Sequence, residues 1–393
     1  MREQPAYLCI DADAHLTEAR DTWTSRVAAK FKDQVPVVRW DPEAKQECWY
    51  MGGIKLPPVG MTACAGYAKP FPEFPATYEE AIDAAYDVDA RLRYMDETGI
   101  WAQVIYPNIG GFGGQDFLKL DDPELKLACV RAYNDFLVDW ASADPARFVL
   151  NVAVPFWDLD ETVKEVERCL KLGFRGVNFT AAPQAFGLPS LGDLHWEPLW
   201  SLAEEARLPI SFHIGSGDMF AADFVERSKV DGMPATIARA SVDCYLTNGI
   251  QLTDLLFSGV LCRHPDLRFV SVESGIGWIP FVLEAADYQF HVNGVGRTRP
   301  EFRMLPSDYF RQNVYACYWF ERGAAEQALD AIGRNNIMFE TDFPHPTCLY
   351  GDVAETIEAG LSGMPADVRR KILFENAAEL FRIDLPESVH LAG

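Results

Sequence analysis

The sequence lacks the features that mark secreted and membrane proteins. Its nine cysteines include no C-x-x-C pair, and their odd number and scattered positions predict reduced, buried thiols instead of a disulfide framework. No uninterrupted apolar run reaches 18 residues, and the N-terminus has no basic stretch followed by an apolar one. These absences predict a cytoplasmic protein with neither a signal peptide nor a membrane span.

Positive charge is also scarce. The 35 Lys and Arg residues stand against 58 Asp and Glu residues, which gives a formal net charge of -23. Such a chain repels phosphate backbones and anionic membrane surfaces, so we expect neither a nucleic-acid nor a membrane partner. An anionic small-molecule substrate remains compatible with this charge, because a bound metal ion dominates the field around itself.

The order of the predicted elements indicates one class of fold. Short runs rich in Val, Ile and Phe predict eight strands, at residues 7–15, 102–107, 148–155, 176–180, 209–215, 268–274, 314–319 and 337–344. Helical periodicity fills most of the intervals between them, as in residues 84–99, 123–143, 158–173 and 234–265. Eight strands alternating with helices predict an α/β fold, a (β/α)8 TIM barrel, as a single domain over residues 1–393.

Two insertions interrupt the predicted barrel, one after strand one and one after strand five. Residues 19–82 contain Pro and aromatic clusters, which predict an ordered loop region, and residues 216–233 are rich in Gly, Asp and Met. Loops after barrel strands cover the active mouth, so we expect these segments and residues 108–121 to shape specificity. The aromatic candidates for excluding water are Trp23, Trp40, Trp49, Phe71 and Phe112.

The stretch "IDADAH" places ionisable residues at alternate positions of the first strand. Asp11, Asp13 and His15 share one strand face, which in a barrel points inward. Unpaired charges buried there would be costly, and a cation would neutralise them. Asp11 lies deeper, and the sequence leaves open whether it joins such a site or is a structural hydrogen-bonding residue.

Other strands also end in groups that can bind a metal. His213 ends strand five, Glu273 ends strand six, and Asp342 ends strand eight with His345 three residues later. Catalytic groups of barrels come from the C-terminal ends of several strands. Two carboxylates and two imidazoles suit Zn, Mn or Fe better than Ca or Mg, so Asp13, His15, His213 and Asp342 predict a transition-metal site. The remaining histidines are interpreted as caps, packing or tail residues, namely His195, His264, His291 and His390.

These motifs resemble the amidohydrolase superfamily, and within it the group that contains aminocarboxymuconate-semialdehyde and γ-resorcylate decarboxylases. The stretches that carry the resemblance are "IDADAHLTE", "SFHIGSG", "GVLCRHPDLRFVSVESGIGWIPFVLE" and "IMFETDFPHP". The resemblance implies that Asp13 and His15 replace the family's H-x-H or E-x-H pair, and that His213 and Asp342 are its other metal ligands. It also implies assembly into homo-oligomers, such as a dimer, or with a homologous subunit.

The chain departs from those decarboxylases on strand six. They carry a catalytic histidine where this chain has Glu273. Glu273 can be a general acid/base, a ligand of a second metal together with His345, or a structural residue that holds "ESGIGW". His345 can ligate a metal, move protons or pack under a loop.

Three functions follow from these residues. The leading hypothesis is a metal-dependent hydrolase or non-oxidative decarboxylase acting on a small organic acid or related carbonyl compound, with a divalent transition metal (Zn if mononuclear) and with Glu273, His345 or Asp342 in catalysis. The alternative is a two-metal, oxygen-activating enzyme with Fe or Mn bound by Asp13, His15, His213, Asp342, Glu273 and His345. The third is a non-catalytic barrel that binds a ligand.

Overall fold

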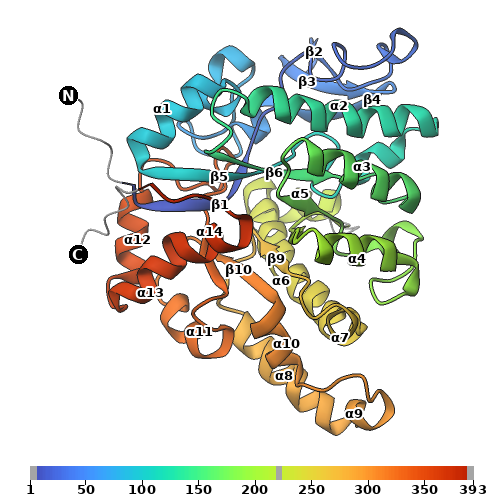
Figure 1. The fold of residues 1–393 in the computed structure, drawn as a ribbon. Coiled ribbons are helices and arrows are strands. Elements are labelled where there is room, and N and C mark those ends of the chain that lie inside the picture. The colour runs from blue at the N-terminus through green and yellow to red at the C-terminus, as the bar shows by residue number, and fades with distance from the viewer. Residues whose placement is uncertain (1–6, 218–223, 387–393) are drawn as a thin grey trace.

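The computed structural model describes residues 7–217 and 224–386, which form an eight-stranded parallel barrel surrounded by helices (Figure 1). Each strand pairs with its neighbours in chain order. The strands are β1 (Cys9–His15), β5 (Ile100–Tyr106), β6 (Phe148–Ala153), β7 (Gly176–Asn178), β8 (Ile210–His213), β9 (Phe269–Val272), β10 (Val314–Tyr318) and β11 (Ile337–Phe339). The predicted TIM barrel and its eight strands are therefore confirmed.

The barrel closes between its first strand and the segment that follows its last strand. Ala14 forms a parallel bridge with Phe343, and the backbone N–H of His15 donates to the carbonyl of Phe343 at 2.6 Å. The N–H of Asp342 donates to the carbonyl of Asp13 at 3.0 Å. This closure brings the end of β1 and the segment that follows β11 together at the C-terminal mouth of the barrel.

Helices cover the outside of the barrel, and their ends follow the capping signals of the sequence. Asp87, Asp122 and Asp158 accept hydrogen bonds from the first turns of the helices that follow them, and Gly99 ends the first of these helices in the left-handed conformation. The helices up to β8 are α1 (Val88–Thr98), α2 (Pro123–Ala141), α3 (Leu159–Lys171) and α4 (Glu197–Glu205). The later ones are α5 (Phe224–Asp231), α6 (Met233–Ser258), α7 (Val260–Arg263), α8 (Ile279–Val292), α9 (Val295–Thr298), α10 (Pro306–Asn313), α11 (Ala324–Ile332), α12 (Val353–Leu361), α13 (Ala366–Arg370) and α14 (Asn376–Phe381).

The insertion after β1 contains a small sheet, where the sequence had predicted a loop region at residues 19–82. Its antiparallel strands are β2 (Val37–Asp41), β3 (Gln46–Met51) and β4 (Ile54–Pro58). Trp23 packs edge-on against Trp49 at 5.4 Å, and its indole N–H donates to the carbonyl of Cys129 on α2 at 3.0 Å. These contacts fasten the insertion to the barrel.

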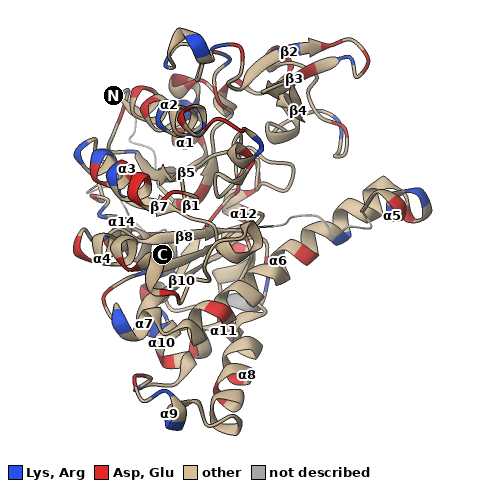
Figure 2. Cartoon of the chain, turned by 90° about the vertical axis from the view of Figure 1, so that its right-hand side faces the viewer, with Lys and Arg blue, Asp and Glu red and all other residues tan. Residues whose placement is uncertain are grey.

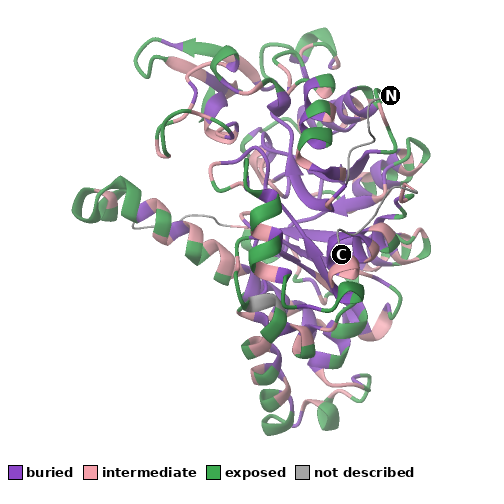
Figure 3. Ribbon diagram, turned by 90° about the vertical axis from the view of Figure 1, so that its left-hand side faces the viewer, coloured by how far each residue is buried: buried purple, intermediate pink, exposed green. Residues whose placement is uncertain are grey.

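The second predicted insertion, residues 216–233, lies only partly within the described residues, since residues 218–223 fall outside them. Its described part includes α5, after which α6 returns toward the barrel (Figure 2). The eight strands of the barrel are almost entirely buried, whereas the outer faces of α5, α6 and α8 are exposed (Figure 3). Among the described helices, none is long and apolar enough to cross a bilayer.

Candidate metal centre

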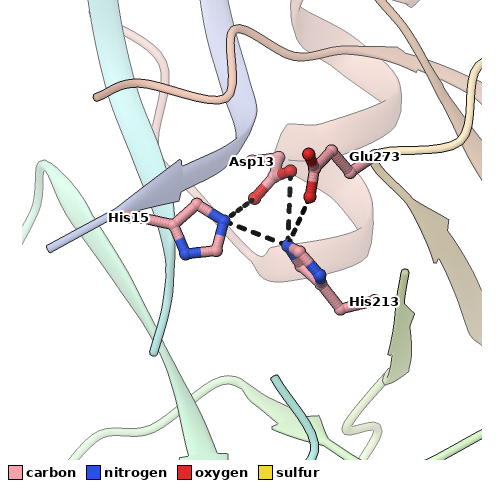
Figure 4. Close-up of side chains that lie close together, drawn as sticks. All are labelled: Asp13, His15, His213 and Glu273. Atoms are coloured by element: carbon pink, nitrogen blue, oxygen red, sulfur yellow. Dashed lines mark hydrogen bonds and ion pairs between the residues drawn. The ribbon is translucent and has the colours of Figure 1, made fainter. Parts of the chain in front are cut away.

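Two histidines from different strands face each other at the barrel mouth. The Nε2 atoms of His15 on β1 and His213 on β8 lie 3.0 Å apart (Figure 4). Their Nδ1 atoms lie 3.2 Å from the carbonyl of Pro107 and 2.8 Å from the carbonyl of Ile214. Because a carbonyl only accepts, each Nδ1 carries the proton and each Nε2 presents a lone pair. Two lone pairs this close repel each other unless a cation lies beside them.

Two carboxylates complete this group of acceptors. Asp13 places its oxygens 3.5 Å from Nε2 of His15 and 3.6 Å from Nε2 of His213, and Oε2 of Glu273 lies 3.4 Å from the same His213 atom. Within the described residues, neither oxygen of Asp13 nor Oε2 of Glu273 has a hydrogen-bond partner, although all three are buried. Buried acceptors without donors are costly, and a divalent transition metal satisfies such a set. The residues therefore fit a metal ion.

A second group of ligands overlaps the first. His15, Glu273, Asp342 and His345 each offer one atom to a cluster in which all atoms lie within 4.8 Å of one another. Nδ1 of His345 lies 2.8 Å from Oδ1 of Asp342, whose other oxygen accepts a hydrogen bond from Thr347 at 2.7 Å. The structure thus brings all six predicted site residues together in two overlapping groups that share His15 and Glu273.

The tautomer of His345 also points to a cation or a proton. Its Nε2 lies 2.7 Å from Oδ1 of Asn108, whose amide nitrogen donates to the carbonyl of Leu16 at 3.0 Å. This second hydrogen bond fixes the amide orientation, so Nε2 of His345 must donate to Asn108. Nδ1 of His345 then presents its lone pair to Oδ1 of Asp342, 2.8 Å away. Because two acceptors this close repel each other, either a proton on Nδ1 or a cation bound by both atoms must separate them.

Electrostatics within this cluster follow from burial. Burial raises the pKa of Glu273 well above its usual value, and the charges of Asp342 and Asp13 raise it further. Burial also lowers the pKa of His15 well below its usual value, with the neighbouring His345 and His213 adding to the effect. Both shifts favour the neutral side chains, as expected where charge is buried without compensation.

The backbone at two of these residues is strained. Glu273 and Asp342 both have a φ of 58°, which is the left-handed region that non-glycine residues rarely adopt. The strain is held by hydrogen bonds: the N–H of Glu273 donates to Glu340 at 3.1 Å, and the N–H of Asp342 donates to the carbonyl of Asp13. Strain of this kind persists where the surrounding structure fixes a functional geometry.

Glu340 is a residue of this region that the sequence analysis missed. It is fully buried, and its Oε1 has no hydrogen-bond partner within residues 7–217 and 224–386. Burial raises its pKa well above the usual value, and the charge of Asp13 contributes. The stretch "ETDFPH" could have indicated Glu340, because in an extended chain a residue two positions before Asp342 lies on the same side.

Asp11 proves to be structural. Its carboxylate accepts hydrogen bonds from the hydroxyl and N–H of Thr341 at 2.6 and 2.8 Å and from the side chain of Gln103 at 2.9 Å. These contacts tie β1 to β5 and to the segment after β11. Burial raises the pKa of Asp11 to about 7. Of the three acidic and imidazole groups of "IDADAH", only Asp13 and His15 therefore belong to the metal cluster.

The remaining histidines lie elsewhere. His264 lies between Glu197 and Glu204, at 3.0 Å from each, and His195 follows the cap residue Asp193. His291 is exposed near the end of α8, and His390 lies outside the described residues.

Phe112 is the aromatic candidate that reaches the cluster. Its ring lies 5.2, 4.5 and 5.8 Å from the rings of His15, His213 and His345. Trp23 and Trp49 instead anchor the insertion, and Trp40 is 55% exposed on its small sheet. Phe71 is only half-buried and has no ring contact within the described part of the chain. Phe112 thus provides the apolar wall beside the three imidazoles.

Comparison with known proteins agrees with this architecture. A γ-resorcylate decarboxylase of Polaromonas sp. (strain JS666) is 26% identical over 305 residues, which are 75% of this chain and 87% of that protein. The solved structure of an amidohydrolase from Mycobacterium avium subsp. paratuberculosis K-10 has a TM-score of 0.74 at 24% identity, covering 95% of this chain and 99% of the other. A dihydroxybenzoic acid decarboxylase from Polaromonas sp. JS666, solved with manganese and 2-nitroresorcinol, has a TM-score of 0.61 at 20% identity, covering 98% and 100%.

The family model for amidohydrolases matches residues 10–383, which is nearly all of the chain. This range contains both the barrel and the six clustered side chains. The chain belongs to the amidohydrolase family.

Proposed function

We propose that this protein is a metal-dependent enzyme that decarboxylates a small organic acid without oxidation. The observation that carries the proposal is the buried cluster in which imidazole lone pairs and carboxylate oxygens converge without donors. The choice of decarboxylation is supported by the relatives, which include γ-resorcylate decarboxylases and a manganese-containing dihydroxybenzoic acid decarboxylase. Hydrolysis of a related carbonyl compound would use the same cluster.

The residues divide into those that hold the metal and those that act on the substrate. Asp13, His15, His213 and Asp342 would hold a divalent ion, Zn or, as in the relatives, Mn. When bound, the ion acts as a Lewis acid that orients and polarises the substrate oxygen. Phe112 covers the three imidazoles and excludes water, which strengthens the electrostatic interactions inside the site.

The proton transfer is assigned to Glu273 or His345. In the reaction the bond between the substrate carbon and its carboxylate breaks, CO2 leaves with no change of oxidation state at the protein, and a proton replaces it on the carbon. Glu273 belongs to both ligand groups and has a strained backbone conformation that its hydrogen bond to Glu340 holds, so its carboxyl group is placed to deliver this proton. Asn108 holds the ring of His345 in one orientation and makes it the second candidate.

The reaction type is tested by the products formed from a panel of aromatic and aliphatic acids, including 2,6-dihydroxybenzoate. We expect release of one CO2 per substrate consumed, no requirement for oxygen, and loss of turnover on removal of the metal with a chelator. Formation of a new carboxylate or amine without CO2 would show hydrolysis instead. Turnover that survives complete removal of the metal would contradict the proposal.

A second function is favoured by one observation, the overlap of the two ligand groups. Three carboxylates and three imidazoles are enough for two ions, and Glu273 occupies a place where the decarboxylases of the resembling group have a histidine. A two-metal, oxygen-activating enzyme with Fe or Mn would use all six. Elemental analysis of the native protein separates the candidates: two ions per chain and oxygen-dependent turnover favour this function, and one ion with oxygen-independent turnover favours decarboxylation.

A further inference from the structure

A buried arginine contacts the backbone that carries the metal cluster. Arg91 on α1 is fully buried, and burial lowers its pKa to about 10, so the guanidinium remains charged at neutral pH. The acceptors of its hydrogen bonds are all uncharged oxygens. A buried charge costs stability, so its role has to be sought in the groups that it holds in place.

The first of these groups is His15, a proposed metal ligand. Nη2 of Arg91 donates to the carbonyl of His15 at 2.7 Å, at the end of β1. The N–H of His15 donates to the carbonyl of Phe343, and its ring Nδ1 donates to the carbonyl of Pro107. Both peptide groups that flank the Cα atom of His15 are thus hydrogen-bonded, which leaves little freedom in the direction of its side chain.

The second group is the segment that carries the ligand Asp342. The guanidinium carbon of Arg91 lies 4.5 Å from the centroid of the Phe343 ring, which is within the range of a cation–π contact. Phe343 directly follows Asp342, whose backbone lies in the left-handed region with a φ of 58°. Arg91 therefore contacts both sides of the closure between β1 and the segment after β11, one through a carbonyl and the other through a ring.

The remaining hydrogen bonds anchor the guanidinium itself. Its Nε donates to the carbonyl of Ala84 at 2.5 Å, and its Nη1 donates to Oε1 of Gln103 on β5 at 3.0 Å. Nε2 of Gln103 in turn donates to Asp11, the carboxylate that also accepts from Thr341. Because the donors of a guanidinium lie in one rigid plane, these contacts fix the direction in which Nη2 meets His15.

We propose that Arg91 is a positioning residue of the metal centre, which sets the geometry of His15 and of the segment that carries Asp342 without touching the ion or the substrate. Lysine cannot replace it, because a single ammonium group cannot reach the carbonyl of His15 and the side chain of Gln103 in the fixed directions of a planar fork. This role rests on the proposed function, since it presupposes an ion at the cluster.

Arg147 offers a matched control at the opposite end of the barrel. It is 5% exposed and donates to the carbonyl of Ile100 at 3.0 Å and to that of Trp101, both at the start of β5. Its guanidinium carbon lies 4.8 Å from the centroid of the Trp101 ring. Arg147 thus makes the same two kinds of contact as Arg91, with backbone carbonyls and with an aromatic face, at residues away from the metal cluster.

The test is the dissociation constant of Mn²⁺, measured by calorimetric titration of the metal-free, full-length protein. Arg91→Lys should weaken binding about 10- to 100-fold, the range for residues that orient metal ligands, whereas Arg147→Lys should leave the affinity unchanged. The electron paramagnetic resonance spectrum of bound Mn²⁺ reports the ligand geometry and should change only in Arg91→Lys. Denaturant unfolding of the metal-free proteins shows how much stability each substitution costs, so the two variants can be compared at similar stability.

An affinity of Arg91→Lys equal to that of the wild type would overturn the role of Arg91 and leave the proposed function standing. An equal loss of affinity in Arg147→Lys would overturn it as well, because stability alone would then govern binding. Arg91→Gln replaces Arg91→Lys if the lysine variant does not fold, and failure of both to fold would restrict Arg91 to a role in stability. A wild type that binds neither Mn²⁺ nor Zn²⁺ would contradict the proposed function itself.

Discussion

Two buried carboxylates lie two positions apart on β1, one deep in the barrel and one nearer its mouth, and their surroundings differ. Asp11 and Asp13 are both fully buried on β1. Asp11 accepts hydrogen bonds from Thr341 and Gln103. Within the described residues the oxygens of Asp13 have no donor, and they lie 3.5 and 3.6 Å from the imidazole nitrogens of His15 and His213, which themselves present lone pairs. The lower layer, around Asp11, is a completed hydrogen-bond network, and the upper layer, around Asp13, is complete only when a cation is added. Burial alone therefore does not identify a functional carboxylate; the identity of its partners does.

The largest effect is expected from removing a ligand of the upper layer. His213→Ala and Asp342→Asn should each lose the metal and reduce activity below detection, because the remaining ligands no longer surround the ion. Metal content by elemental analysis and turnover of the native substrate measure this. The matched control is His291→Ala, whose imidazole is exposed on α8 and should leave both unchanged. Full metal occupancy in His213→Ala would show that His213 is not a metal ligand.

A smaller kinetic effect is expected at Glu273. Glu273→Gln should keep at least one metal ion and reduce kcat by about 10²- to 10⁴-fold, the range for loss of a general acid or base. The amide retains the size of the side chain but cannot transfer the proton. Glu321→Gln is the control, since Glu321 accepts hydrogen bonds from Ile276 and Gly277 and so holds the "GIGW" turn without contacting the cluster. A fully active Glu273→Gln enzyme would remove Glu273 from the mechanism.

The difference between Asp11 and Asp13 can be measured through the free energy of unfolding of their variants. In metal-free protein, Asp11→Asn should lower the free energy of unfolding by about 1–3 kcal/mol, because the amide group of Asn would face donors that the carboxylate satisfied. Asp13→Asn should leave the stability of metal-free protein unchanged or raised, because it removes a buried charge that has no partner. Denaturant unfolding of both variants provides the values. Equal destabilisation by the two substitutions would break the distinction between the layers.

A further effect, confined to a narrow range of pH, is a dependence of stability on pH at Glu18. This buried carboxyl accepts hydrogen bonds from the N–H groups of Asn108 and Ile109 at 2.9 Å each, and burial raises its pKa to about 7 from 4.5. Between these two values the folded state holds a proton that the unfolded state has lost, so stability falls as the pH rises from 4.5 to 7. The loss attributable to Glu18 is at most about 3 kcal/mol.

Glu18→Gln isolates this contribution, since glutamine does not titrate and its carbonyl oxygen can accept the same two hydrogen bonds. Relative to the wild type, the variant should gain stability as the pH rises across this window and stay parallel above it. A constant difference between the two proteins at every pH from 4 to 8 would show that Glu18 does not titrate there.

Much of this architecture could be predicted from the sequence, because the relevant signals are local. Short apolar runs predict the strands. The two-residue period of a strand places Asp13 and His15 on the same face. His213, Glu273 and Asp342 could be placed near them because parallel barrel strands end at one mouth. The fate of Asp11 could not be predicted, since it depends on Thr341, which lies 330 residues away along the chain.

Other features need the assembled chain. The small sheet of residues 37–58 was expected as loop, because its strands are short and half exposed and its Pro and aromatic residues obscure the period of two. Asn108 and Glu340 were missed because each acquires its role from a residue far away along the chain, Asn108 from the ring of His345 and Glu340 from the backbone N–H of Glu273. The helix α6 was predicted from its periodicity over residues 234–265, but α5 lies in the segment expected as an insertion. Periodicity also does not reveal that the first half of α6 leaves the barrel surface (Figure 2).

The central claim is that the facing lone pairs and unpartnered carboxylate oxygens at the barrel mouth exist to bind a cation. The most direct measurement is calorimetric titration of the metal-free protein with Mn²⁺ or Zn²⁺, in the wild type and in His213→Ala. The account predicts saturable binding of at least one ion per chain to the wild type and at least a 100-fold weaker affinity in the variant. No binding to the wild type, or equal binding to both proteins, would contradict it.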